Sequence, residues 1–479
     1  MKSPFAVHQS VYFALGILIM KSVSLIMLPI VTYYLSPAQF GDLELLLSIS
    51  DFASILIGFG MSEALYRFAG LSQSKEDEAR VAGTIFTVTI FSGTIAFILG
   101  MIGAPFLLPF LGGEITLTDL RILVFLFAVD GLIVIPLAWL KLKENAFTFF
   151  VLTTGKAIIQ AILTWQLLKA DFGISAILIA GAVSSVVLVF VLFKMQYDDT
   201  GIQLDTKRLP EIMIYGAPLV VSYVAAFALL SADRWVISAV STQEELGLYA
   251  LAKKLAFIIF ILMQPFWLWW AALRFKTLNG EGGKEEVARV TSFGIALTAI
   301  FAALVLIGSP IMMDLFINES FAGAMVFLPP LAILFAGKLM GEMANLGCYV
   351  GKTTYSVMTI DLVSAGVSVL GMYLLSEPFG IDGVIAALLI AQAVRMASFY
   401  FVSQRVLYLN YAKGKLMGLF AICIGLSYVS LQIDNLIQHF IMVTVALITL
   451  LVYVHYSGLY SFKPLIDKLM QRIKPAPIA

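Results

Sequence analysis

An aspartate and an arginine stand side by side in an otherwise apolar stretch, SADRWVIS, from Ser231 to Ser238. Placing a charge in hydrocarbon costs several kcal/mol, so charges kept there usually face a polar cavity or a partner. Adjacent residues of a helix point about 100° apart, so Asp233 and Arg234 should serve different contacts. We expect Arg234 to contact an anion, and Asp233 either to neutralise it or to act as a protonatable coupling site.

Other ionisable residues lie within apolar runs, and we expect them to line the same polar cavity. The bases assigned to substrate binding are Lys21, Lys156, Arg234, Lys254, Lys338 and Arg395. The acids assigned to charge balance or ion coupling are Asp51, Asp130, Asp233, Glu342 and Asp361. With Lys253 included the bases outnumber the acids, which favours an anionic ligand.

Two of these assignments have simpler alternatives. Lys338 and Glu342 are four residues apart on one helix and could neutralise each other. Lys253 is near the end of its apolar run and could extend to the membrane interface.

The elements that position these charges are membrane-spanning helices. Of the 479 residues, 61% are hydrophobic and 13% are charged, and the mean hydropathy is +0.97. Repeated apolar runs of about 20 residues predict an all-α polytopic membrane protein with about fourteen spans. The predicted spans lie near 11–35, 41–66, 81–103, 118–140, 145–168, 173–193, 211–239, 246–272, 287–307, 322–350, 354–376, 383–403, 414–431 and 436–457.

Basic residues fall on alternate loops between these spans. One set of loops holds most of them, including Arg67, Arg274 and Lys413, whereas the opposite loops hold only Arg121 and Lys169. The positive-inside rule therefore predicts that both termini are cytoplasmic. The first apolar run is longer than a signal-peptide core and is taken as an uncleaved span.

Two stretches of the chain resemble each other. YLSPAQFGDLEL (Tyr34 to Leu45) aligns with AVSTQEELGLYAL (Ala239 to Leu251) when Gly41 is paired with Gly247. The repeat predicts two six-helix lobes in parallel pseudo-repeat around a central cavity, plus two extra C-terminal helices. The predicted parts are an N-lobe at 1–194, a cytoplasmic linker at 195–210, a C-lobe at 211–404, helices thirteen and fourteen at 405–457 and a cytoplasmic amphipathic tail at 458–479.

Prolines within spans and two further motifs have weaker interpretations. Pro29 and Pro218 would kink spans one and seven, as hinges or as static bends. QPFWLWW, Gln264 to Trp270, is read as an interfacial aromatic belt rather than a sugar-stacking platform. GCYVGKTT lacks one residue between its glycines for a phosphate-binding loop.

Nothing in the sequence indicates catalysis. The three histidines and two cysteines are scattered, and no pattern for a metal or another cofactor appears. The formal net charge of zero gives no reason to expect nucleic acid as a partner.

The stretches LPIVTYYLSPAQFGDLEL and ADRWVISAVSTQEELGLYALAKKL (Ala232 to Leu255) resemble a known family. It is the polysaccharide-transporter branch, the Wzx-type O-antigen flippases, of the multidrug/oligosaccharidyl-lipid/polysaccharide exporter superfamily. The resemblance implies two lobes around a cationic cavity, with helices one and seven bending as access alternates. It also implies that Asp233 and Arg234 occupy the family's Asp-basic position and that Lys21 is the facing cation in the first lobe.

The resemblance also implies a function. Such proteins flip polyprenyl-diphosphate-linked oligosaccharides, such as lipopolysaccharide O-antigen repeat units, across the bacterial cytoplasmic (inner) membrane. The implied partners are that cargo, a proton or sodium ion, membrane lipids and glycan polymerase or assembly proteins.

Three alternatives to a flippase are open. A drug/cation antiporter of the same superfamily should favour carboxylates and aromatics in its cavity. A membrane glycan polymerase or ligase should show a large outer loop with Arg and His. A scaffold for glycan synthesis would leave the charges within spans unexplained.

Overall fold

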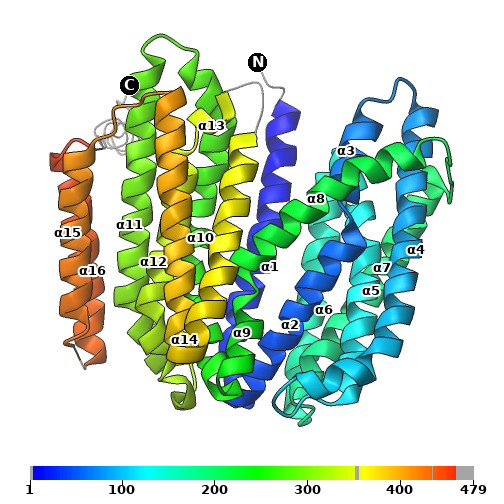
Figure 1. The fold of residues 1–479 in the computed structure, drawn as a ribbon, viewed down its shortest axis with the longest axis horizontal. Helices are drawn as coiled ribbons and strands as arrows, with labels where there is room; N and C mark the ends of the chain where they lie inside the picture. The colour runs from blue at the N-terminus through cyan, green and yellow to red at the C-terminus, as the bar shows by residue number, and fades with distance from the viewer. Residues whose placement is uncertain (1–3, 351–354, 434, 460–479) are drawn as a thin grey trace, which may run out of the picture. The chain divides into compact units, whose positions relative to one another are not determined.

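The computed structural model describes residues 4–350, 355–433 and 435–459, and every regular element in these ranges is a helix (Figure 1). The chain forms two compact units, Met1–Ala250 with Ala365–Ala387, and Leu251–Ser364 with Leu388–Ala479. The predicted lobe boundaries stay a prediction.

The first unit is built mainly from the N-terminal helices. They are α1 (Pro4–Tyr34), α2 (Pro37–Gly58), α3 (Met61–Gly70), α4 (Lys75–Leu107), η1 (Leu108–Phe110), α5 (Leu117–Leu142), α6 (Ala146–Lys169), α7 (Ile174–Thr200), α8 (Leu209–Leu230) and α9 (Asp233–Val240). Two helices contribute residues to both units, α10 (Gln243–Leu278) and α14 (Tyr355–Val406). The second unit also contains α11 (Gly283–Phe316), η2 (Glu319–Phe321), α12 (Ala324–Ala344), α13 (Gly347–Val350), α15 (Lys413–Ser430) and α16 (Leu436–Tyr456).

Twelve helices of the described chain are long and apolar enough to cross a membrane. One of them, α14, has 52 residues and a non-helical Gly380 (φ 56°, ψ −134°), so it is two helices joined at a kink. Counting α14 twice and adding the 31-residue α1 gives the fourteen helices that the sequence predicts. The predicted polytopic all-α class is confirmed.

The predicted span at 211–239 is wrong in one respect that matters for the site. The chain leaves the helix at Ser231, turns through Ala232 and starts α9 at Asp233. An acidic residue in the first turn of a helix is favoured by the partial positive charge there. Asp233 and Arg234 therefore begin a new short helix instead of lying within a long one.

Local sequence signals explain where other helices begin. Ser36 caps α2, its hydroxyl accepting from the Gln39 N–H while the Gln39 side chain accepts from the Ser36 N–H, with Pro37 in the first turn. Thr116 and Asp119 form the same reciprocal cap on α5.

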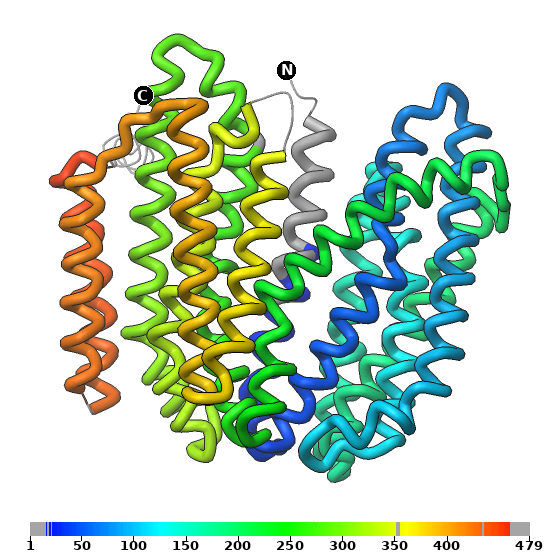
Figure 2. Tube along the Cα trace, in the orientation of Figure 1, coloured from blue at the N-terminus to red at the C-terminus, as the bar shows by residue number. Residues whose placement is uncertain are grey.

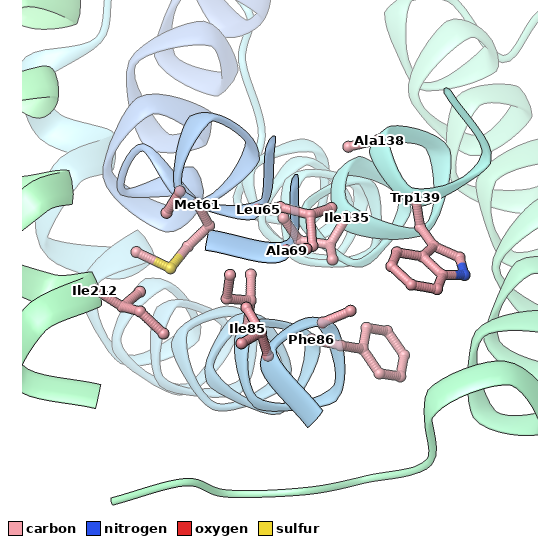
Figure 3. Close-up of a cluster of buried hydrophobic side chains, with 12 residues drawn as sticks. Met61, Leu65, Ala69, Ile85, Phe86, Ile135, Ala138, Trp139 and Ile212 are labelled. Carbon is pink, nitrogen blue, oxygen red and sulfur yellow. The ribbon is translucent and has the colours of Figure 1, made fainter. Parts of the chain in front are cut away.

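The first unit has an apolar core where α3, α4, α5 and α8 meet (Figure 3). Met61 and Leu65 of α3 face Ile85 and Phe86 of α4, and Ile135 of α5 packs beside them. All five side chains are almost completely buried. This core packs α3 against α4, α5 and α8.

The second unit has its core along α11. Small residues of that helix, including Ala296, Ala299 and Ala303, let α15 and α16 approach closely, and Leu419 and Leu450 fill the contact. The helices α15 and α16 run side by side (Figure 2). They carry none of the charges assigned to the site.

The two glycines paired by the sequence repeat touch each other in the first unit. A Cβ on Gly41 would overlap the carbonyl oxygen of Gln243, and a Cβ on Gly247 would overlap that of Pro37. The contact is reciprocal, since each glycine meets the carbonyl four residues before the other. The first turns of α2 and α10 therefore pack backbone against backbone.

Candidate functional site

Arg234 forms an ion pair with a residue that the sequence reading did not select. Its Nη2 lies 3.2 Å from Oε2 of Glu44 on α2, whose side chain is only 2% exposed. Glu44 lies in the second turn of α2, close to the end of a predicted span. A carboxylate at that position does not by itself indicate a functional site. Its partner is distant in sequence, so no local pattern could have joined them.

Asp233 points to a different neighbour, as expected for adjacent helical residues. One oxygen accepts from the N–H of Arg234 at 3.1 Å, and the other accepts a short hydrogen bond from the hydroxyl of Tyr249 on α10. Asp233 is 1% exposed and Tyr249 is fully buried. The carboxylate partner of Arg234 is thus Glu44 on another helix, and the side chain of Asp233 is held by Tyr249.

Trp235 ties this cluster to α2 and α8. Its indole N–H donates to the hydroxyl of Ser48 at 2.8 Å, and its ring packs on Phe52 and Phe227 with centroids 5.3 and 5.1 Å away. An apolar cavity of about 540 Å³ lies beside Trp235, between α2, α4, α5 and α9. The short helix α9 is therefore held on one side by charge and on the other by rings.

Lys156 and Asp130 form a second ion pair in the first unit. The Lys156 ammonium lies 2.8 Å from the Asp130 carboxylate, which also accepts from the Ser185 hydroxyl at 2.6 Å. The three residues come from α6, α5 and α7, so the pair fastens three helices together. Lys156, predicted to contact substrate, has a protein carboxylate as its partner here.

The second unit brings together a larger set of predicted residues. Arg395 Nε lies 2.8 Å from Asp361 Oδ1, and its Nη1 lies 3.9 Å from Glu342. Glu342 also accepts from the indole N–H of Trp267 at 3.2 Å. The ammonium of Lys338 lies 5.9 Å from the centroid of the Phe260 ring. Glu342 instead contacts Arg395 and Trp267.

Arg274, which the sequence assigned to a cytoplasmic loop, belongs to the same cluster. Its Nη1 donates to Asn345 at 3.3 Å, and its guanidinium lies over the rings of Trp267 and Tyr349 at 5.5 and 5.1 Å. Trp267, assigned to an interfacial belt, is thus part of a charged cluster. The signal available in the sequence was the spacing of Trp267 and Arg274, seven residues apart on one helical face.

The two units differ in the balance of charge among the side chains described above. In the first, Glu44, Asp130 and Asp233 outnumber the bases Arg234 and Lys156. In the second, Arg274, Lys338 and Arg395 outnumber Glu342 and Asp361. The cationic excess predicted for one cavity therefore belongs, among the described side chains, to the second unit.

Two guanidinium nitrogens of the second cluster, Arg274 Nε and Arg395 Nη1, are buried and have no hydrogen-bond acceptor among the residues that the structure describes. A buried donor without an acceptor costs about 1–3 kcal/mol. Both nitrogens belong to bases of one cluster, so the cluster has capacity for additional acceptor oxygens.

The remaining predicted residues are placed as follows. Asp51 lies on α2 and Lys254 lies on α10. Lys21 lies on α1, but its side chain is outside the described part of the chain, as are Lys352 and residues 460–479 of the predicted tail. Pro29 and Pro218 lie inside α1 and α8, which continue through them.

These helices and their buried charges define a polytopic membrane protein with the fold of known transporters. The sequence profile of the family described as "Polysaccharide biosynthesis protein" matches residues 22–265, just over half of the chain, and the protein belongs to this family. No curated protein matches the chain.

Three solved structures have a similar fold. The lipid II flippase MurJ in an inward closed conformation has a TM-score of 0.72 and 13% identity, covering 96% of this chain and 99% of its own. An inward-facing MATE family multidrug resistance transporter of the MOP superfamily has a TM-score of 0.59, 12% identity and coverage of 83% and 95%. The bent form of the Vibrio cholerae MATE transporter VcmN has a TM-score of 0.52, 14% identity and coverage of 85% and 99%. The predicted membership of the exporter superfamily is confirmed by family and fold together.

Proposed function

We propose that the protein is a flippase that moves a polyprenyl-diphosphate-linked oligosaccharide, a polysaccharide or O-antigen repeat unit, from the inner to the outer leaflet. The bacterial cytoplasmic membrane is the proposed location, with both termini cytoplasmic as the distribution of basic loop residues predicts. Membership of a polysaccharide biosynthesis family and a fold shared with a lipid II flippase support the proposal.

The basic cluster of the second unit is the observation that carries the proposal. Arg274, Lys338 and Arg395 come from three helices, and two of them have buried nitrogens that meet no acceptor within the described part of the chain. Guanidinium groups bind phosphate through charge-assisted hydrogen bonds that strengthen away from water. The diphosphate of the cargo is the anion that suits this cluster, and Trp267 and Tyr349 beside it offer rings for the first sugar.

The acidic cluster of the first unit suits ion coupling. Asp233 and Glu44 are buried carboxylates, one held by a neutral hydroxyl and the other by Arg234. A proton or sodium ion that binds there would compete with these contacts, and so would change how α9 is held. This coupling role is part of the same proposal. It would use α9 as a separate short helix whose contacts change when the ion binds.

Export of glycan by variants tests the anion site. Arg395→Ala and Lys338→Ala should abolish surface polymer while the amount of protein in the membrane stays normal. The matched control is Arg289→Ala, because Arg289 is an exposed base whose pairing is with Glu286 on the same helix. Full export by both site variants would refute the assignment.

Mass spectrometry of polyprenyl-linked glycans from cells depleted of the protein tests the function itself. Flipping predicts that a diphosphate-linked repeat unit accumulates on the cytoplasmic side and that surface polymer disappears. If single units reach the outer face and only the polymer is lost, the protein acts after translocation, as a polymerase or ligase would.

A further inference from the structure

A groove on the first unit is not used by the proposed function. It has a volume of about 580 Å³ and lies between α5 and α7, with Met101 of α4 at its edge. One wall carries Arg121 and Phe125, and the other carries Ala182, Val183 and Val187. The groove is open beside α7, where its lining includes alanine and valine. All the lining side chains except Arg121 and Thr118 are apolar.

Among the described residues that line the groove, Arg121 is the only charged one, and no described carboxylate pairs with it. Asp119, two residues earlier, is engaged by the hydroxyls of Thr116 and Ser175. Within the described ranges Arg121 makes no ion pair, and its side chain is exposed. Lys169, the other base predicted for this side of the membrane, lies over the ring of Trp165 at 4.4 Å instead.

The length of the groove is close to the depth of one leaflet of the hydrocarbon core. Its lining on α7 runs from Ile179 to Val187, which is about 12 Å of helix at about 1.5 Å per residue. One leaflet of the hydrocarbon core is about 15 Å deep, half of about 30 Å. A cation at the end where α5 begins, followed by an apolar channel of that length, matches an anionic head group followed by an acyl chain.

We propose that this groove binds one anionic glycerophospholipid, with its phosphate on Arg121 and an acyl chain between Phe125 and the valines of α7. On the predicted orientation this is a lipid of the outer leaflet. The site is separate from the charged clusters above, and the proposal does not depend on what the protein transports.

Native mass spectrometry of the purified full-length protein, titrated with phosphatidylglycerol or phosphatidylcholine, tests the site. Arg121→Gln should weaken phosphatidylglycerol binding about fivefold, the effect of one basic residue near an anionic head group. Lys169→Gln is the matched control, because that base is stacked on Trp165. Equal loss in both variants, or in neither, would overturn the assignment of the phosphate.

A second pair of variants tests the channel. Val183→Trp should fill the groove and abolish the bound phosphatidylglycerol. Val191→Trp is the control, since Val191 lies two turns further along α7 with the same exposure, 42% against 43%, and outside the groove. Thermal unfolding of each variant shows whether it is folded. Undiminished binding by folded Val183→Trp protein would show that no acyl chain occupies the groove.

Discussion

At the residue scale, the structure replaces a predicted substrate contact by a pair within the protein. The sequence selected Arg234 as an anion contact, and the structure gives it Glu44 as its partner, with little of either side chain exposed. A charge buried without a partner is far more costly than a buried pair. In this conformation Glu44 pairs with Nη2 of Arg234, while Nε of Arg234 is buried with no acceptor among the described residues.

Replacing Glu44 by glutamine should therefore destabilise the protein strongly. Removing one partner of a buried ion pair costs about 3–5 kcal/mol, and Glu44 is the carboxylate that stabilises the Arg234 charge most, followed by Asp233 and Asp51. We expect a large fall in the midpoint of thermal unfolding of Glu44→Gln in detergent. The double variant Glu44→Gln with Arg234→Met should recover much of the loss, since it removes the stranded charge.

The pair of Lys156 and Asp130 serves as the control for that measurement. About a third of the Asp130 side chain is exposed, against 2% of Glu44, so the charge that Asp130→Asn leaves on Lys156 is less deeply buried. A less buried pair contributes less to stability, so the midpoint should fall less than it does for Glu44→Gln. If Asp130→Asn and Glu44→Gln were equally destabilising, burial would not be what makes the Glu44 contact important.

At the scale of the elements, the sequence predicted the helices well and their breaks poorly. Apolar length alone identified fourteen spans, because a helix must cover the hydrocarbon core. The interruption at Ser231 and Ala232 carries neither proline nor glycine, so nothing in the local sequence marks it. Contacts of Asp233, Arg234 and Trp235 with other helices hold the new helix in place, and these are tertiary effects.

The repeat was a weak signal in the sequence, and the structure gives it a physical meaning. Gly41 and Gly247 are glycines because each faces a carbonyl of the other helix at the same relative position. That alignment could be made from sequence, but a similarity between two stretches does not say that the stretches touch. The contact had to come from the structure.

Adding a methyl group to this contact should separate the first turns of α2 and α10. Overpacking a filled contact costs about 1–3 kcal/mol, and here the obstacle is backbone, which cannot rotate away. Gly41→Ala should lower the unfolding midpoint and reduce export. The control on the same helix is Gly58→Ala, where a Cβ would meet nothing within 4 Å. Equal behaviour of the two variants would contradict a close contact at Gly41.

At the scale of the whole molecule, composition predicted the class and could not predict the partners of the charges. A chain with 61% hydrophobic residues must lie in a membrane, whatever its details. The charges within spans were identified as a set, and most of those described are found paired. Pairing depends on which helices meet, so the predicted excess of bases over acids could not be assigned to either unit from sequence alone.

The charge balance of the second unit predicts that removing one carboxylate should strengthen anion binding. A purely structural role of that carboxylate would not have this effect. Asp361 holds Arg395 at 2.8 Å and therefore competes with any anion for the same guanidinium. Asp361→Asn should raise the affinity for inorganic pyrophosphate, used as a probe for the diphosphate, by about tenfold, the worth of one hydrogen bond to a charged group. Arg395→Gln should lower it, and both can be measured by calorimetry on the purified protein.

Both variants should reduce transport, although they change the affinity for the anion in opposite directions. A flippase must release its cargo on the far side, and Asp361, which pairs with Arg395 in this structure, can displace the diphosphate from Arg395. Export by Asp361→Asn should therefore fall despite tighter binding, because release becomes slow, whereas export by Arg395→Gln falls because binding is lost. If Asp361→Asn bound pyrophosphate no more tightly than the unaltered protein, Arg395 would be a purely structural partner of Asp361, and the anion site would have to be sought at Arg274 and Lys338.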